Sequence, residues 1–152
     1  MAYTSDEARQ DLLDAFAEAI EHIGVALADL GAAYELLDER NGDRLEEELF
    51  GPVQRAYGRA KSTHAQFAER NRITSREFAT PSPGLPSTGA KGLIDGAVGS
   101  VAQADAALSG LQDSSLPTEV GDRELRAALT EVRELLGGVR QRAREIERTL
   151  GR

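Results

Sequence analysis

A seven-residue apolar repeat runs through the first forty residues of the chain without a slip. Its spacings alternate between three and four residues, the pattern of one apolar stripe along a helix that packs against other helices at a shallow angle. The residues beside the stripe are mostly alanine and glycine, so neighbouring backbones can approach closely. The repeat therefore predicts an all-α fold. Its members are Leu13, Phe16, Ile20, Ile23, Leu27, Leu30, Tyr34 and Leu37.

Apolar spacing and breaker residues divide the chain into four predicted helices. Asn41-Gly42-Asp43 is a turn signal after the first helix, because glycine allows positive φ and aspartate caps the next helix. Gly51-Pro52 predicts a kink or restart, and Gly137-Gly138 predicts a bend. A loop is expected at SSLPTEVGD before the last helix. The predicted helices span about 5–39, 44–71, 88–113 and 122–150.

A proline-rich linker over residues 72–88 separates the two halves. Its prolines exclude regular helix, and Phe78 and Leu85 are the apolar residues expected to pin it. Extended, it reaches about 50 Å, whereas the second helix spans about 42 Å, so the third helix can begin at either end of the molecule. We predict one domain, residues 1–152, built as a four-helix antiparallel bundle of two helical hairpins.

Composition narrows the classes of function. The chain of 152 residues has no cysteine, which excludes disulfides and thiolate chemistry. It begins without the pattern of a signal peptide and contains no long apolar run, so a cytoplasmic protein with no membrane partner is expected. A net charge of −8 argues against nucleic-acid binding, because a phosphate backbone repels an acidic chain. No cofactor is expected.

Charge is unevenly distributed. Residues 1–50 hold 14 acidic and 3 basic side chains, whereas residues 51–152 hold 12 acidic and 15 basic ones. Four arginines crowd the last predicted helix. We interpret them as a solvated or salt-bridged face, or as a contact with the acidic first helix, within the chain or across a dimer. They are Arg140, Arg142, Arg144 and Arg148.

Two histidines suggest a metal or small-ligand site. Glu18 and His22 are four residues apart and share a helix face, and an antiparallel hairpin would place His64 at about the same height. Imidazole and carboxylate are ligands that transition metals accept. A metal-binding bundle that uses Glu18, His22 and His64 is therefore one alternative.

The segment from Arg59 to His64 resembles the ribonuclease motif of HEPN domains, which are small helical bundles. The resemblance implies a metal-independent ribonuclease in which His64 acts as general base and Arg59 holds the phosphate. The polar residue that usually follows the arginine is replaced here by Ala60. No other part of the chain matches that family.

Two acidic pairs resemble the magnesium-binding pattern of the all-α nucleotide pyrophosphohydrolases. They are Glu18-x-x-Glu21 and Glu35-x-x-Asp38. That family places its pairs on facing helices, whereas the uninterrupted repeat puts both on one helix, about 25 Å apart. Two pairs at that separation cannot share one metal cluster.

The remaining sequence features indicate helix packing and not chemistry. Gly92-x-x-x-Gly96 followed by Gly99 predicts a close helix contact within the bundle or a self-association face. No convergent polar set lies on the apolar stripe. We therefore predict a non-enzymatic helical interaction or scaffold protein that forms a homodimer or binds a protein partner.

Overall fold

The computed structural model describes residues 3–150, and within them the chain is helical with no strand. The all-α class is thereby confirmed for this part of the chain, whereas the finer four-helix antiparallel arrangement stays a prediction. None of the helices within these residues is both long enough and apolar enough to span a membrane. The α-helices are α1 (Ser5–Glu35), α2 (Glu39–Leu45), α3 (Gly51–Arg70), α4 (Gly89–Asp113), α5 (Leu116–Glu119), α6 (Arg123–Leu136) and α7 (Val139–Leu150), with a π-helical turn η1 (Glu46–Phe50) and a 3-10 turn η2 (Pro86–Thr88).

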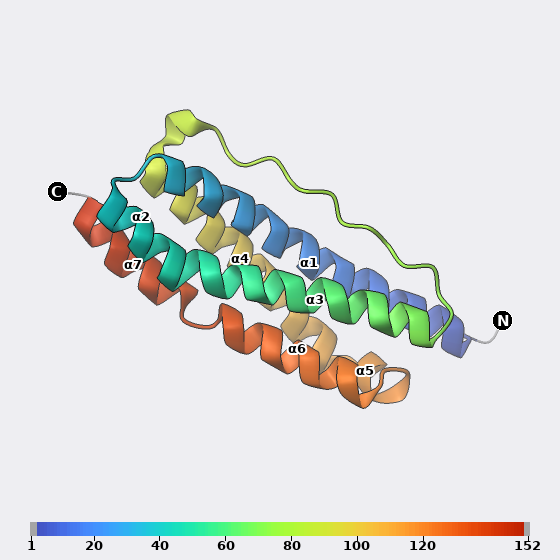
Figure 1. Cartoon of the computed structure of the whole chain (residues 1–152). Coiled ribbons are helices and arrows are strands. Elements are labelled where there is room, and N and C mark those ends of the chain that lie inside the picture. The colour runs from blue at the N-terminus through green and yellow to red at the C-terminus, as the bar shows by residue number, and fades with distance from the viewer. Residues whose placement is uncertain (1–2, 151–152) are drawn as a thin grey trace.

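The long helices lie side by side along one axis (Figure 1). α1 and α6–α7 run from right to left in that view, whereas α3 and α4 run from left to right. α1 packs most extensively against α4, and α3 against α6. Their apolar faces meet in one core, in which Phe16, Ile20 and Ile23 of the repeat are fully buried.

The start of α1 follows from local chemistry. The Thr4 hydroxyl accepts a hydrogen bond from the Glu7 amide at 3.0 Å, and the Glu7 carboxylate accepts one from the Thr4 amide at 3.3 Å. This capping box satisfies two amides that the first turn leaves free, and its acidic residues favour the positive end of the helix dipole.

The predicted turn at Asn41-Gly42-Asp43 is wrong, and with it the end of the first helix at 39. α1 ends at Glu35, the chain turns over residues 36–38, and α2 begins at Glu39, so Asn41 and Gly42 are helical. Gly42 is buried against Tyr34, whose ring would lie 3.3 Å from a Cβ at that position. The glycine therefore serves a close contact instead of a turn.

The predicted interruption at Gly51-Pro52 takes the form of a π-helical turn. The Gly51 amide bonds to the Glu46 carbonyl, five residues back, so the helical path continues from α2 into α3. Proline has no amide to donate and crowds the preceding turn, and the wider turn accommodates both effects.

The last predicted helix is two helices. α6 ends at Leu136 and α7 begins at Val139, because Gly137 is extended and Gly138 has a φ of 87°. That positive φ is a conformation open to glycine but costly for other residues. The expected loop before α6 contains the short helix α5.

The linker runs back along the whole molecule and places the start of α4 beside the end of α1 (Figure 1). It is held by the ion pair of Arg76 with Glu21, by Phe78 and by Gly84, whose amide donates to Asp29 Oδ1 at 2.7 Å. Leu85 is 70% exposed, so the expectation that it pins the linker is wrong.

Candidate functional site

His64 lies in the core and not in a cleft. Its side chain is 3% exposed and packs between Phe16 and Phe78, with ring centroids 5.9 and 5.3 Å away. Its Nε2 lies 3.2 Å from the Leu13 carbonyl oxygen, whereas Nδ1 is buried without a partner. Burial lowers the pKa of His64, so the imidazole is neutral at pH 7.

Arg59 has different surroundings from those of His64. Its guanidinium is 38% exposed, and its Nε donates to Glu131 of α6 at 2.8 Å. A phosphate in solvent can reach Arg59 but not the enclosed imidazole. The geometry therefore does not assemble these two residues into one accessible site.

Glu18 and His22 line a cavity of about 580 Å³ between α1 and α4 that His64 does not line. The rest of its wall is mostly small residues, with Gln103 as a further polar group. Among residues 3–150, no group of three histidine, cysteine or acidic side chains is arranged to hold a metal ion. The proposed ligands are thus divided between a cavity and the core.

The glycines of α4 lie where that helix meets α1 and the linker. A Cβ on Gly96 would lie 3.1 Å from Asp29 Oδ2, and one on Gly92 would lie 2.9 Å from the Thr88 Cβ. Gly99, in contrast, faces open space. The first two glycines therefore permit a close approach, which accounts for the glycine-rich start of the helix.

A second cavity, of about 500 Å³, lies between α4 and the junction of α6 with α7. Its wall combines apolar side chains such as Val98 and Val101 with the ion pair between Asp105 and Arg133, whose closest atoms are 2.8 Å apart. The break at 137–138 forms one edge. Sequence reasoning missed this cavity, although the two adjacent glycines were its visible signal.

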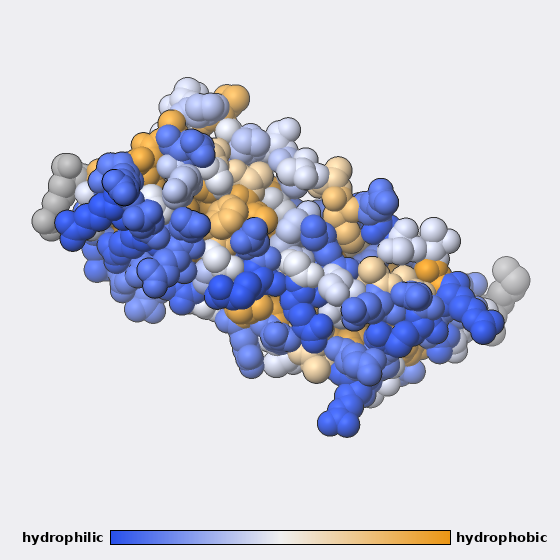
Figure 2. All heavy atoms as spheres, in the orientation of Figure 1, coloured by the Kyte–Doolittle hydropathy of each residue, from blue (hydrophilic) through white to orange (hydrophobic). Residues whose placement is uncertain are grey.

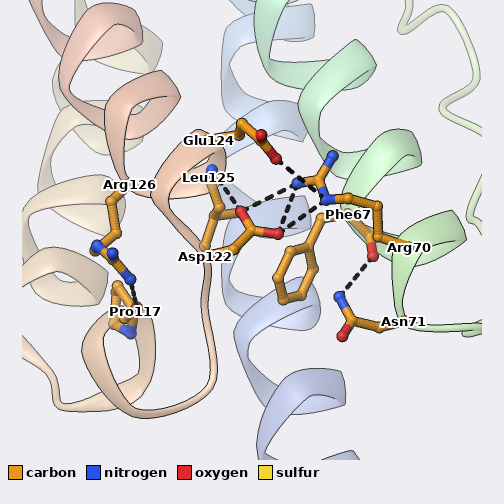
Figure 3. Close-up of polar contacts among 8 residues, drawn as sticks. All are labelled: Phe67, Arg70, Asn71, Pro117, Asp122, Glu124, Leu125 and Arg126. Carbon is orange, nitrogen blue, oxygen red and sulfur yellow. Dashed lines mark hydrogen bonds and ion pairs between the residues drawn. The ribbon is translucent and has the colours of Figure 1, made fainter.

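One end of the molecule is held by a polar cluster (Figure 3). Asp122 accepts two hydrogen bonds from Arg70, at 2.9 and 3.0 Å, and one from the Leu125 amide at 2.8 Å. Burial opposes ionisation of Asp122, but these bonds and the charge of Arg70 lower its pKa overall. Asp122 thus caps α6 and ties it to α3, which is a structural role.

The opposite end, where the surface is largely hydrophilic (blue at the left of Figure 2), carries two rows of charged residues. We define the basic row as Arg140, Arg144 and Arg148 of α7, and the acidic row as Glu39, Asp43 and Glu47 of α2 and η1. All six residues are exposed, and each row has a spacing of four. No ion pair joins any of them to another side chain within residues 3–150.

The seam between α2 and α7 separates the two rows. Across it, Arg44 lies 3.9 Å from Glu145, and the Thr149 hydroxyl lies 3.3 Å from the Asn41 side-chain oxygen. α7 packs against α2, η1 and α4. Among the described residues, the helix that carries these arginines therefore packs mainly against α4 and the segment after α1.

Glu147 lies beside the basic row with an unusual pKa. Burial and a hydrogen bond with Asp95 raise its pKa to about 7, although Lys91 and Arg144 act in the opposite direction. Glu147, Lys91, Arg144 and Arg148 line a shallow cavity of about 290 Å³.

No protein-family model, curated protein or solved structure matches this chain. The functional interpretation therefore depends on the geometry alone.

Proposed function

We propose that this chain is a non-enzymatic helical interaction or scaffold module that self-associates, built as an antiparallel four-helix bundle of two helical hairpins. One observation carries the proposal: α2 with η1 carries an exposed acidic row and α7 an exposed basic row, and no ion pair joins either row to another side chain within residues 3–150. Exposed charge of both signs suits an interface in which each row meets its opposite on a partner.

The distribution of polar groups favours binding over catalysis. His64 is enclosed, Arg59 is paired with Glu131, and Glu18 and His22 lie in another cavity. A catalytic site requires a nucleophile or base, its orienting partner and a stabilising group around one reacting atom. The candidate groups of this chain are distributed over separate surroundings instead.

The oligomeric state tests the proposal. Sedimentation equilibrium or light scattering at micromolar protein should give a mass above that of the monomer of 16.3 kDa. Raising the salt from about 0.05 M to about 0.5 M should lower that mass, because it shortens the range of charge interactions. A monomeric mass at every concentration and at low salt would refute self-association.

The cavity between α4 and α6 supports a second candidate function, the binding of a small amphipathic molecule. Its volume of about 500 Å³ lies within the range of ligand sites, and it combines apolar walls with a few polar groups. The dye anilinonaphthalene sulfonate should fluoresce when it is bound there. Ala102→Trp should abolish the signal, whereas Ala106→Trp, which fills the cavity between α1 and α4, should leave it. Equal effects of the two variants would exclude this cavity.

A further inference from the structure

We propose that this chain binds a small organic cation, a quaternary ammonium ion, in a cavity of about 270 Å³ that α1 and η1 form together. The lining residues are Gly31, Tyr34 and Glu35 of α1 with Glu46 and Phe50 of η1. This cavity is separate from the one between α4 and α6, and binding in it does not depend on self-association.

The local backbone explains why these residues meet. Gly31, Tyr34 and Glu35 are spaced by three and four residues, so they share one face of α1. Glu46 and Phe50 begin and end the π-helical turn, which joins α2 to α3 and packs against α1 beside its C-terminal end (Figure 1). Turns of this kind are rare and are found frequently at functional sites.

Two aromatic rings, one from each element, border the cavity. Phe50 lies against Gly31, with its Cε2 3.9 Å from a Cβ built on the glycine. Tyr34 belongs to the apolar repeat and packs on Gly42, yet it is 39% exposed. Because Gly31 has no side chain, the space between the two elements stays open.

Every other group in the lining attracts positive charge. The face of an aromatic ring is negative, and a cation placed over it is held electrostatically. Glu35 and Glu46 contribute carboxylates, and no lysine, arginine or histidine lines the cavity. Glu35 is also the last residue of α1, where the helix dipole is negative and the last turn has no basic residue.

The described part of the chain supplies no cation of its own to this cavity. Within residues 3–150, no ion pair involves Glu35 or Glu46, and no basic side chain lies over the ring of Tyr34 or Phe50. The ring of Tyr57 differs, because Lys61 Nζ lies 4.0 Å from its centroid. The attraction at the cavity is therefore left for an external cation.

The same chemistry favours an organic cation over a metal ion. Calcium and magnesium take about six or more oxygen ligands, whereas the cavity offers two carboxylates and two rings. A quaternary ammonium ion instead contacts aromatic faces through its methyl groups. The volume lies near the lower limit of small-molecule sites, so the ion is small.

A free cation is favoured over a lipid headgroup that carries the same ammonium group. In phosphatidylcholine a phosphate lies next to the ammonium, and it would face Glu35 and Glu46. Two carboxylates repel that phosphate but attract a cation without an attached anion.

Choline is the probe that tests the site. Isothermal titration calorimetry should detect its binding at millimolar concentration, and the Gly31 amide should shift in an NMR titration. The dimethylbutanol in which carbon replaces the nitrogen of choline has the same shape without the charge. It should bind at least about tenfold more weakly. Magnesium chloride at matched ionic strength should not displace choline.

Four variants remove one attraction each. Glu35→Gln and Glu46→Gln remove a charge and keep the shape, whereas Tyr34→Leu and Phe50→Leu remove a ring and keep an apolar side chain. Each should weaken choline binding by about fivefold. Circular dichroism shows that every variant is folded, and Tyr34→Leu, at an exposed ring, tests the aromatic contribution even if Phe50→Leu unfolds.

The matched controls lie outside the cavity. Glu18→Gln changes an exposed carboxylate of the same helix, and Tyr57→Leu removes the ring that Lys61 already covers. Both should bind choline like the wild type.

Each outcome decides one claim. Equal binding of choline and its neutral analogue, or no binding of choline, would overturn the cation site. Cavity variants that bind like the wild type, or controls that weaken binding as much, would overturn its location. Cosedimentation with phosphatidylcholine vesicles that Tyr34→Leu abolishes would assign the site to a lipid headgroup and overturn the free ligand. A monomeric wild type that binds choline would refute self-association alone.

Discussion

Asp29→Ala should release the linker from the helices beneath it. Asp29 lies on α1, is 7% exposed, and accepts the Gly84 amide at 2.7 Å from its Oδ1. Removal of the carboxylate leaves that amide without its partner at a site where the linker packs on α4, since Leu93 lies 3.2 Å from a Cβ built on Gly84. The linker should then separate from α1 near residue 84.

The expected change in the free energy of unfolding follows from this single hydrogen bond. A hydrogen bond to a charged group contributes about 1.5–3 kcal/mol, and the relief from burying a carboxylate offsets part of it. We expect Asp29→Ala to lower the free energy of unfolding by about 1.5–2 kcal/mol. Asp29→Asn retains an acceptor oxygen and should cost only about 0.5–1 kcal/mol.

Urea denaturation measures the free energy, and hydrogen exchange at the Gly84 amide measures the local release. Exchange should accelerate in Asp29→Ala more than the global loss of stability accounts for. Glu18→Ala, at an exposed acidic residue of the same helix, is the control and should change stability by less than about 0.5 kcal/mol. An Asp29→Ala protein with unchanged Gly84 exchange would refute the reasoning.

Three further predictions can be checked by urea denaturation. Gly99→Ala should raise the free energy of unfolding by about 0.5–1 kcal/mol, because a Cβ there meets open space. Gly138→Ala should lower it by about 1–2 kcal/mol, because the φ of Gly138 is 87°. A loss for Gly99→Ala and a gain for Gly138→Ala would contradict these backbone conformations. Glu147 has a pKa raised to about 7 from an ordinary 4.5, so the folded state retains its proton more strongly and loses stability as the pH rises between these values. Glu147→Gln should therefore stabilise the protein by about 1–2 kcal/mol at pH 8 and by little at pH 4, allowing for contact with solvent. A gain that is independent of pH would count against the raised pKa of Glu147. Burial lowers the pKa of His64, so the folded state favours the neutral imidazole, and the free energy of unfolding falls as the pH drops below 6.5. His64→Leu should make this acid-side loss of stability smaller. If the variant loses stability with pH as the wild type does, His64 does not contribute to the loss.

Local signals predicted the helices well where one residue pattern dominates. The repeat from Leu13 to Leu30 and the prolines of the linker act over a few residues, so the sequence alone could reveal them. The prediction of a turn at Gly42 was wrong because glycine is common both in turns and where helices pack closely. Only the position of Tyr34 against it distinguishes the two.

The candidate sites were less predictable, because they depend on which faces meet. Helix spacing placed Glu18 and His22 on a shared face, and both do line one cavity. The same spacing could not show that Phe78 of the linker would cover His64. The path of the linker determines that contact, and its length allowed the following helix to begin at either end of the molecule.

The sequence by itself determined the all-α class and the buried stripe of α1, because the period of an α-helix is local and the apolar residues repeat in step with it. Only the tertiary structure decided that the linker returns along α1, that His64 is enclosed, and that α7 packs against α2, η1 and α4. These are relations between residues far apart in the chain. Burial of apolar surface and the reach of the linker determine them together, and no pattern within a single helix records the outcome.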